Sequence, residues 1–174
     1  MRRRLRHLFN VINCKYNLFN TFYSVKNFSN ERAVVNNKKQ YIMARKDYRE
    51  QNQRFMDEIS KAEGVLELGN GVYYKVLATG KGKSPSFFNS VVTCHYRGRR
   101  ADGYVFDDSF NRGVPEAFRI NEVIPGFGAA LQKMHIGDRW EVYIPYTQGY
   151  GTRAMGPIPG FSTLIFEIEL CSAE

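Results

Sequence analysis

The segment VVTCHYRGRRADGYVFDD, residues 91–108, constrains the fold more than any other part of the chain. It joins two β-rich runs through RRADG, residues 99–103, which is the pattern of a β-hairpin. Tyr96 and Asp107 stand near the ends of runs that otherwise suit a core. A tyrosine hydroxyl and a carboxylate brought together at the edge of an apolar cavity can satisfy each other's hydrogen bonds. The pair is therefore a candidate polar element of such a cavity.

Two later segments alternate apolar and other residues with the period of strands that bury one face. The apolar positions of these segments are Trp140, Val142 and Ile144, followed by Leu164, Phe166, Ile168 and Leu170. Between the hairpin and these segments, Pro125 opens a short helix whose Phe127, Leu131 and Met134 share one face. The pattern predicts an α+β fold, in which an antiparallel sheet wraps over one short helix.

The net charge of +8 lies entirely in the first quarter of the chain. Residues 1–42 hold nine Lys or Arg, one Glu and eight Asn, whereas residues 43–174 hold 16 basic and 16 acidic residues. The folded part therefore has no basic excess for nucleic acid. We expect residues 1–42 to be a disordered basic tail or a non-native upstream extension, with an organellar targeting peptide and a nucleic-acid or membrane-binding arm as alternatives.

A helical pattern begins after Met43. Tyr48, Phe55 and Ile59 recur on one narrow face, with Asn52 as a polar interruption, between a possible N-cap at Asp47 and a stop at residue 64. We expect an amphipathic helix within residues 43–66, formed over 47–63 and packed on its own domain. Weak pairing with a second copy is the alternative. No run of 18 apolar residues is present, and we expect no membrane contact.

The three cysteines, Cys14, Cys94 and Cys171, cannot all pair within one chain and lack metal-ligand spacing. We interpret Cys94 and Cys171 as small buried residues of strands. This usage favours a reducing compartment, and we expect a cytoplasmic protein unless the tail targets an organelle.

Residues 70–172 resemble the FKBP-type peptidyl-prolyl cis/trans isomerases. The resemblance rests on the hairpin and on a series of short matches in family order, which are EVIPGF at 122–127, IP at 144–145, GYG at 149–151, IP at 158–159 and TLIFEIEL at 163–170. It implies a half-open antiparallel sheet of five to six strands around one short helix, formed by residues 67–174. It also implies isomerisation of X–Pro bonds, with a proline-segment-holding chaperone module of little turnover as the alternative.

The resemblance assigns site residues position by position. Tyr96, Asp107 and Tyr150 are the expected catalytic group, in which Asp107 acts on the substrate carbonyl or orients Tyr96 rather than serving as a base. The expected substrate-binding residues are Phe106, Val123, Ile124, Phe127, Ile158 and Phe166. The backbone N–H of Ile124 and the hydroxyl of Tyr150 are expected to bind substrate carbonyls.

The expected partners are proline-containing polypeptides and, in the same pocket, macrolide ligands. No cofactor or metal is required, because the reaction is a bond rotation. Four residues depart from the common family pattern. Phe127 stands where many members carry tryptophan, Glu116 where some carry an aromatic residue, and Gly160-Phe161 where proline and a polar residue are usual. These changes bear on the loop geometry and on macrolide affinity.

Overall fold

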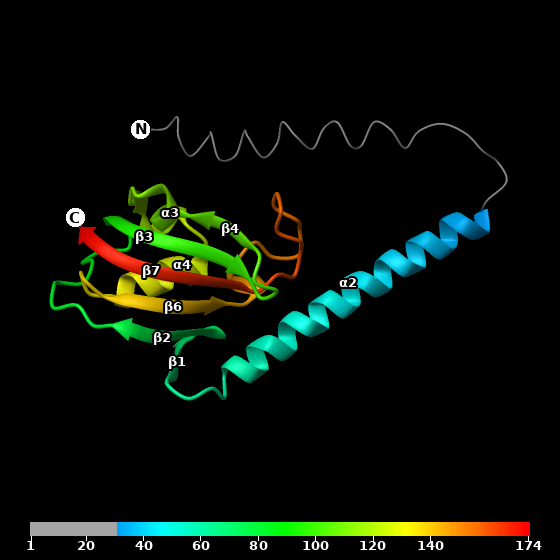
Figure 1. Cartoon of the computed structure of the whole chain (residues 1–174), viewed down its shortest axis with the longest axis horizontal. Helices are drawn as coiled ribbons and strands as arrows, with labels where there is room; N and C mark the ends of the chain where they lie inside the picture. The colour runs from blue at the N-terminus through cyan, green and yellow to red at the C-terminus, as the bar shows by residue number, and fades with distance from the viewer. Residues whose placement is uncertain (1–30) are drawn as a thin grey trace.

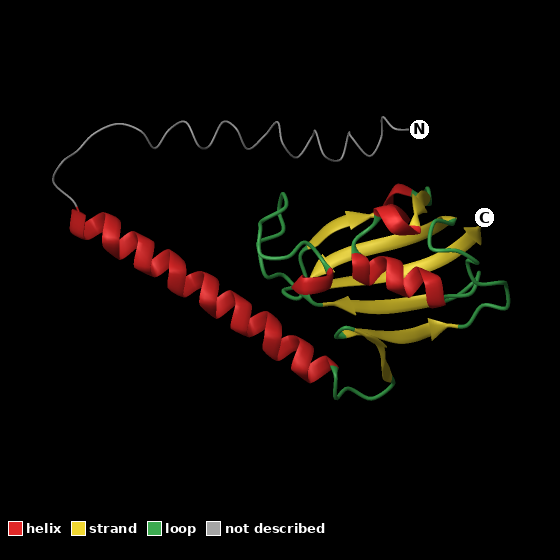
Figure 2. Cartoon of the chain, turned by 180° about the vertical axis from the view of Figure 1, so that it is seen from behind, coloured by secondary structure: helices red, strands yellow, loops and turns green. Residues whose placement is uncertain are grey.

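The structure is a computed structural model that describes residues 31–174, with side chains from residue 38 onward. A long helix leads into a seven-stranded antiparallel sheet that curves around one short helix (Figures 1 and 2). The elements are α2 (Glu31–Ile59), β1 (Val65–Gly69), β2 (Val72–Ala78), β3 (Val91–Arg100), β4 (Val105–Asp108), α3 (Ser109–Arg112), β5 (Glu116–Arg119), η1 (Ile120–Glu122), α4 (Pro125–Lys133), β6 (Arg139–Ile144), η2 (Tyr146–Gln148) and β7 (Leu164–Ala173). The expected α+β architecture is confirmed.

The sheet has the strand order β1-β2-β6-β7-β3-β4, and β5 forms a further pair with β3. The last strand, β7, therefore lies between β6 and β3, where Phe166 faces Gly98 and Ile168 faces Tyr96. The predicted hairpin is present as β3 and β4, joined by a turn that contains Gly103 in the left-handed conformation. This arrangement brings both halves of the hairpin beside the strand that carries Phe166.

Helix α4 lies against one face of the sheet and completes the main core (Figure 2). Pro125 stands in its first turn, where a missing N–H costs nothing, and the predicted face of Phe127, Leu131 and Met134 is buried. Gly126 permits the close approach, because a Cβ at this position would lie 2.5 Å from the Cγ2 of Ile144. The helix therefore presses directly on β6.

The C-terminal half of α2 packs on the opposite face of the sheet. Met56 contacts Tyr143 and Ile165, which form a second, smaller core cluster. The strand alternation places both residues on the outer face, yet they are only 6% and 0% exposed. The helix covers them, and the expected packing of the helix on its own domain is observed for this half.

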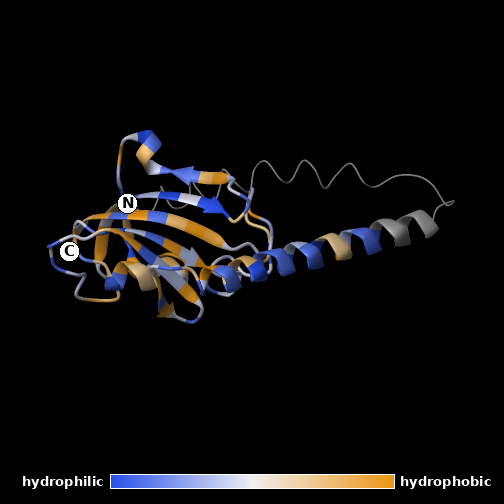
Figure 3. Ribbon diagram, turned by 60° about the horizontal axis from the view of Figure 1, so that its bottom comes forward, coloured by the Kyte–Doolittle hydropathy of each residue, from blue (hydrophilic) through white to orange (hydrophobic). Residues whose placement is uncertain are grey.

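The bounds of α2 correct two expectations. Periodicity predicted a helix over 47–63 after a disordered segment that ended at 42, whereas the helix runs from Glu31 to Ile59. Residues 31–42 are therefore helical, and the remainder of the expected tail, residues 1–30, lies outside the described residues. Tyr41, Ile42 and Met43 are each more than half exposed, so residues 38–47 of the helix present no apolar stripe to a core (Figure 3).

The helix also ends four residues earlier than expected. Beyond Ile59 the chain tightens into turns, in which the N–H of Ala62 bonds the carbonyl of Ile59, and Gly64 adopts a left-handed conformation past the helix. Along residues 31–174, no helix combines the length and the apolar character that a membrane crossing requires.

The cysteine expectation is half right. Cys94 is fully buried on the core face of β3, and burial raises the pKa of its thiol to about 12. Cys171 is exposed instead, because the core face of β7 carries residues 164, 166, 168 and 170 and the alternation turns residue 171 outward. Both thiols are free.

Candidate active site

The hairpin brings Tyr96 and Asp107 together at the rim of the main core. Tyr96 lies on β3, and Asp107 lies on β4, where it pairs with Gly98 of β3. The Tyr96 hydroxyl donates a hydrogen bond of 2.5 Å to Oδ2 of Asp107. Tyr96 is 6% exposed, whereas the Asp107 side chain is 21% exposed. The carboxylate therefore stands where the apolar interior meets solvent.

Four phenylalanine rings surround this pair and form a five-ring cluster with Tyr96. Phe127 of α4 is central, with ring centroids 5.0 Å from Phe166, 6.0 Å from Phe118 and 6.1 Å from Tyr96. Phe106 lies edge-on to Phe166 at 5.7 Å. Most of these contacts are edge-to-face, so the rings face several directions rather than forming one stack.

A short helix holds Arg112 across the rim from Tyr96. The carboxylate of Asp108 caps α3 by accepting from the N–H of Asn111 at 3.0 Å, and the buried Ser109 hydroxyl accepts from the N–H of Tyr96 at 2.7 Å. These bonds fix α3 to the hairpin. Arg112, in the last position of the helix, then forms ion pairs with Asp107 and with Glu116.

Burial and the Asp107 carboxylate shape the protonation of the two site tyrosines. Burial, together with the hydrogen bond and charge of Asp107, raises the pKa of Tyr96 well above its ordinary value. Burial and then the charge of Asp107 also raise the pKa of Tyr150, which is 37% exposed. Both hydroxyls therefore remain protonated donors at neutral pH.

The predicted site residues gather around one apolar region. Tyr96, Phe127, Phe166 and Ile158 are buried in the main core, and Phe106, Val123 and Ile124 pack against it half-buried. Ile124 is the N-cap residue of α4. The substrate contacts assigned to Ile124, Tyr150 and Ile158 stay predictions.

Sequence reasoning did not assign Arg112 and Phe118 to the site, and it noted Glu116 only as a departure from the family pattern. In the pairing of β5 with β3, Glu116 faces Cys94 and Phe118 faces Val92. Residues directly opposite share a face of the sheet, so both belong to the face that buries Tyr96. The available signal was the spacing of two between Glu116 and Phe118, which marks a carboxylate on an otherwise apolar face.

The loop that carries Ile158 is fastened from two sides. Arg100 of β3 donates to the carbonyl of Pro157 at 2.7 Å, and Arg45 of α2 donates to the carbonyl of Thr152 at 3.2 Å. Phe161 ends the loop in a left-handed conformation, with φ of 69°, which is unusual for a bulky residue. Residues 149–161, here called the flap loop, are thus positioned by both the sheet and the long helix.

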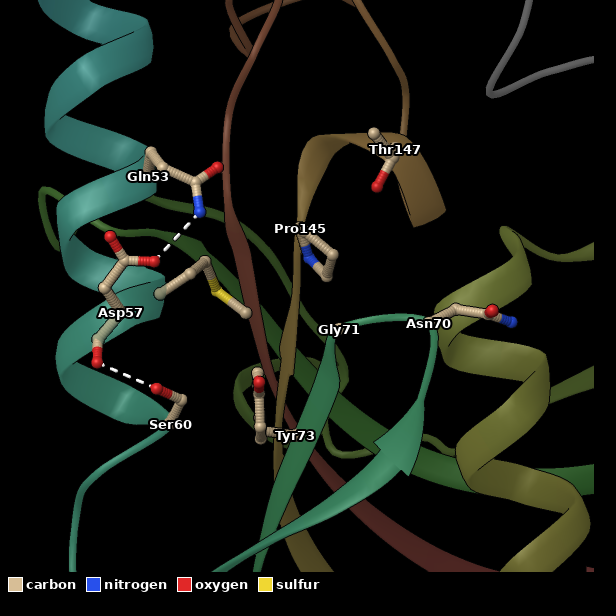
Figure 4. A pocket seen from close by; sticks show the side chains of 9 residues that line it. Gln53, Asp57, Ser60, Asn70, Gly71, Tyr73, Pro145 and Thr147 are labelled. Atoms are coloured by element: carbon tan, nitrogen blue, oxygen red, sulfur yellow. Dashed lines mark hydrogen bonds between the residues drawn. The ribbon is translucent and has the colours of Figure 1, made fainter.

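A pocket of about 230 Å³ lies between α2 and the β1–β2 turn (Figure 4). Its lining includes Gln53, whose amide donates to Asp57 at 3.0 Å, and Tyr73 of the second core cluster. It belongs to the contact between the helix and the sheet, and it shares no residue with the aromatic site.

Comparison with known proteins decides the family. Residues 83–171 match the sequence profile described as FKBP-type peptidyl-prolyl cis-trans isomerase. The chain belongs to this family. The FKBP-type 22 kDa peptidyl-prolyl cis-trans isomerase of Escherichia coli is 43% identical to it over 118 residues, which cover 67% of this chain and 57% of that protein. The chain spans less than two thirds of the length of the curated relatives that it resembles.

Solved FKBP-type structures share the fold. A peptidyl-prolyl cis-trans isomerase from Pseudomonas syringae superposes with a TM-score of 0.69 at 36% identity, over 74% of this chain and 95% of that one. FkpA from E. coli superposes with a TM-score of 0.73 at 26% identity, over 95% of this chain and 81% of that one. The FKBP-type match thus extends through most of the described residues.

Proposed function

We propose that this FKBP-type chain accelerates cis/trans isomerisation of X–Pro bonds in folding or unfolded polypeptides. The observation that carries the proposal is the Tyr96–Asp107 hydrogen bond at the rim of a cluster of five aromatic rings. Membership of the isomerase family supports the same reading.

The chemistry requires no nucleophile. Rotation about a prolyl bond is opposed by a barrier of ~18–20 kcal/mol, because it breaks amide resonance. The twisted amide has less charge separation than the planar one, so an apolar pocket stabilises it preferentially. The apolar environment comes from five aromatic residues, which are Tyr96, Phe106, Phe118, Phe127 and Phe166. The backbone N–H of Ile124 and the hydroxyl of Tyr150 hold substrate carbonyls.

Asp107 acts electrostatically in this proposal. Its Oδ2 accepts from Tyr96 and its Oδ1 accepts from Arg112, so neither oxygen is poised to remove a proton. The carboxylate is instead held in one orientation at the pocket rim. There it faces the carbonyl carbon of the twisted bond and keeps Tyr96 in place.

The test is isomerisation of X–Pro peptides by the full chain, followed by NMR exchange, beside folded Asp107→Ala and Phe166→Ala variants. We expect rates well above the uncatalysed reaction, reduced in both variants. A folded chain with no activity on any X–Pro peptide would refute the enzyme. Retained peptide binding in that case would favour a holding module for proline-containing segments.

We propose that a macrolide occupies the aromatic pocket in competition with peptide. Competitive inhibition of isomerisation tests this.

We also propose an oligomeric state and a cellular location. The chain is a monomer, which is supported by the packing of Met56 of α2 on its own Tyr143 and Ile165, and light scattering reports its mass. A cytoplasmic location is consistent with the free thiols of Cys94 and Cys171, and cell fractionation tests it.

A further inference from the structure

Two carboxylates share one guanidinium at the rim of the aromatic pocket. Arg112 pairs with Oδ1 of Asp107 through one terminal nitrogen and with Oε1 of Glu116 through the other. Within this group of three the charges sum to one negative charge. All three side chains reach solvent, with exposed fractions of 21% for Asp107, 44% for Arg112 and 36% for Glu116.

The second oxygen of Glu116 retains its capacity to accept a hydrogen bond. Oε2 lies 3.4 Å from the Tyr96 hydroxyl, whose single hydrogen is committed to Asp107 at 2.5 Å. A hydroxyl has one hydrogen to donate, so the longer contact leaves Oε2 without a strong donor from Tyr96. The excess negative charge is therefore centred on Glu116.

The position of Glu116 places that charge beside the aromatic rings. Pairing with β3 fixes Glu116 on the face of Tyr96, and Phe118, two residues further along β5, forms part of the ring wall. Apolar rings on one side reduce screening by water on that side. A cation on a bound peptide would meet Oε2 beside the rings that hold proline.

We propose that Glu116 determines substrate specificity by favouring polypeptides that carry Lys or Arg next to the proline. The inference rests on the proposed isomerase function and adds a substrate class to it. Glu116 attracts the cation through Oε2, whose contact with Tyr96 is long, whereas an acidic neighbour of proline meets a like charge. Because the pair is partly exposed, the preference is of the size of a surface ion pair, about twofold to fivefold.

The experiment compares three peptides that are identical except for Lys, Gln or Glu beside the proline, with the change made before the proline in one set and after it in another. Rates by NMR exchange and dissociation constants by NMR titration are measured for the full chain and for Glu116→Gln. Glu58→Gln, which removes an exposed carboxylate from α2, is the control for net charge.

The full chain is expected to favour the Lys over the Glu peptide by about twofold to fivefold in at least one set, and salt near 0.5 M is expected to reduce the ratio towards one. In Glu116→Gln the ratio is expected to be close to one, because the remaining Asp107 and Arg112 charges cancel. In Glu58→Gln it is expected to match that of the full chain.

Three results would overturn the inference. The first is equal isomerisation rates and dissociation constants for all peptides with the unmodified chain. The second is an unchanged Lys-to-Glu peptide ratio in Glu116→Gln. The third is an equal loss of rate for all peptides in Glu116→Gln, which would mean that Glu116 only holds Arg112 in place. Failure of the proposed function gives a different result, the absence of turnover for every peptide. In that case the dissociation constants test the charge preference, because equal constants for the Lys and Glu peptides would overturn it. If Glu116→Gln does not fold, the salt dependence of the ratio in the unmodified chain serves as the test.

Discussion

The side-chain amide of Asn52 bonds the backbone of Thr163, 111 residues away: its Oδ1 accepts from the Thr163 N–H at 2.6 Å. Both residues are buried, and the Thr163 hydroxyl returns a bond of 3.3 Å to the carbonyl of Asn52. The long helix α2 is thereby joined to the start of β7, immediately after the flap loop.

We expect Asn52→Ala to lower the free energy of unfolding by ~1–3 kcal/mol, because the buried N–H of Thr163 loses its acceptor. Urea denaturation checks this. Gln51→Ala, an exposed substitution on the same helix, should change stability by less than about 0.5 kcal/mol. Equal stability of the two variants would show that the bond contributes nothing.

Arg49 is expected to restrain the flap loop. Its guanidinium lies 5.4 Å from the Phe161 ring and 5.9 Å from the Tyr146 ring, and such exposed contacts are worth ~0.5–1 kcal/mol. Arg49→Ala should therefore speed amide hydrogen exchange in residues 149–161 by about twofold to fivefold. Arg54→Ala, which removes a contact with Glu50 on the same helix, should leave that exchange unchanged. Equal exchange in both variants would contradict a role for Arg49.

Tyr96→Phe removes the donor to Asp107 and retains the ring. We expect kcat/KM for an X–Pro peptide to fall by about tenfold, which corresponds to ~1.4 kcal/mol and is typical of a hydrogen bond to a charged group. Tyr41→Phe, at an exposed position of α2, should match the unmodified chain. Full activity in folded Tyr96→Phe would mean that Asp107 needs no orientation by Tyr96.

Stability should decline in alkaline solution through Tyr96. Its pKa is raised on folding by burial and by Asp107, so above the ordinary tyrosine pKa of ~10 the unfolded chain loses a proton that the folded chain keeps. The free energy of unfolding then falls with rising pH by up to ~1.4 kcal/mol per pH unit from this group. Unfolding between pH 9 and 11 should be less pH-dependent in Tyr96→Phe. Identical slopes would refute the raised pKa.

Gly98→Ala should displace two rings of the aromatic cluster. A Cβ at residue 98 would lie 2.5 Å from Cε2 of Phe106 and 2.8 Å from Cε1 of Phe166. The rings must shift, at a cost of ~1–3 kcal/mol in stability and with lower isomerisation rates. Adding Phe106→Leu should recover part of the lost stability by making room. A stable, fully active Gly98→Ala would show that the rings adjust without cost.

The sequence predicted the sheet, α4 and the hairpin because the spacing of apolar residues along each element indicates which of its faces meets the core. It did not predict the first part of α2, since residues 38–47 are exposed and no core imposes a period on them. The polar Asn52 looked like an interruption of the helical stripe. Its burial follows from a bond to Thr163, a partner that local spacing does not specify.

The same distinction applies to the site. The Tyr96–Asp107 pair was predictable because a short hairpin sets the register of its two strands. The ion pairs of Arg112 depend on how α3 and β5 fold back on that hairpin. Likewise, Tyr143 and Ile165 appeared to face solvent until a second element, α2, covered them. Contacts between elements, rather than within them, account for what was missed.

Helix α2 runs without interruption from Glu31 through residues 38–47, which are exposed, into a C-terminal half that is anchored on the sheet (Figure 1). Residues 31–40, which precede Tyr41 and Arg45 beside the flap loop, span about 15 Å at the helical rise per residue. The anchored half fixes the direction of this helical segment. The length of the segment fixes how far Glu31 lies from the rest of the domain. Glu31 is therefore held about 15 Å beyond the contacts of α2 with the flap loop, at a separation that a flexible linker would not maintain.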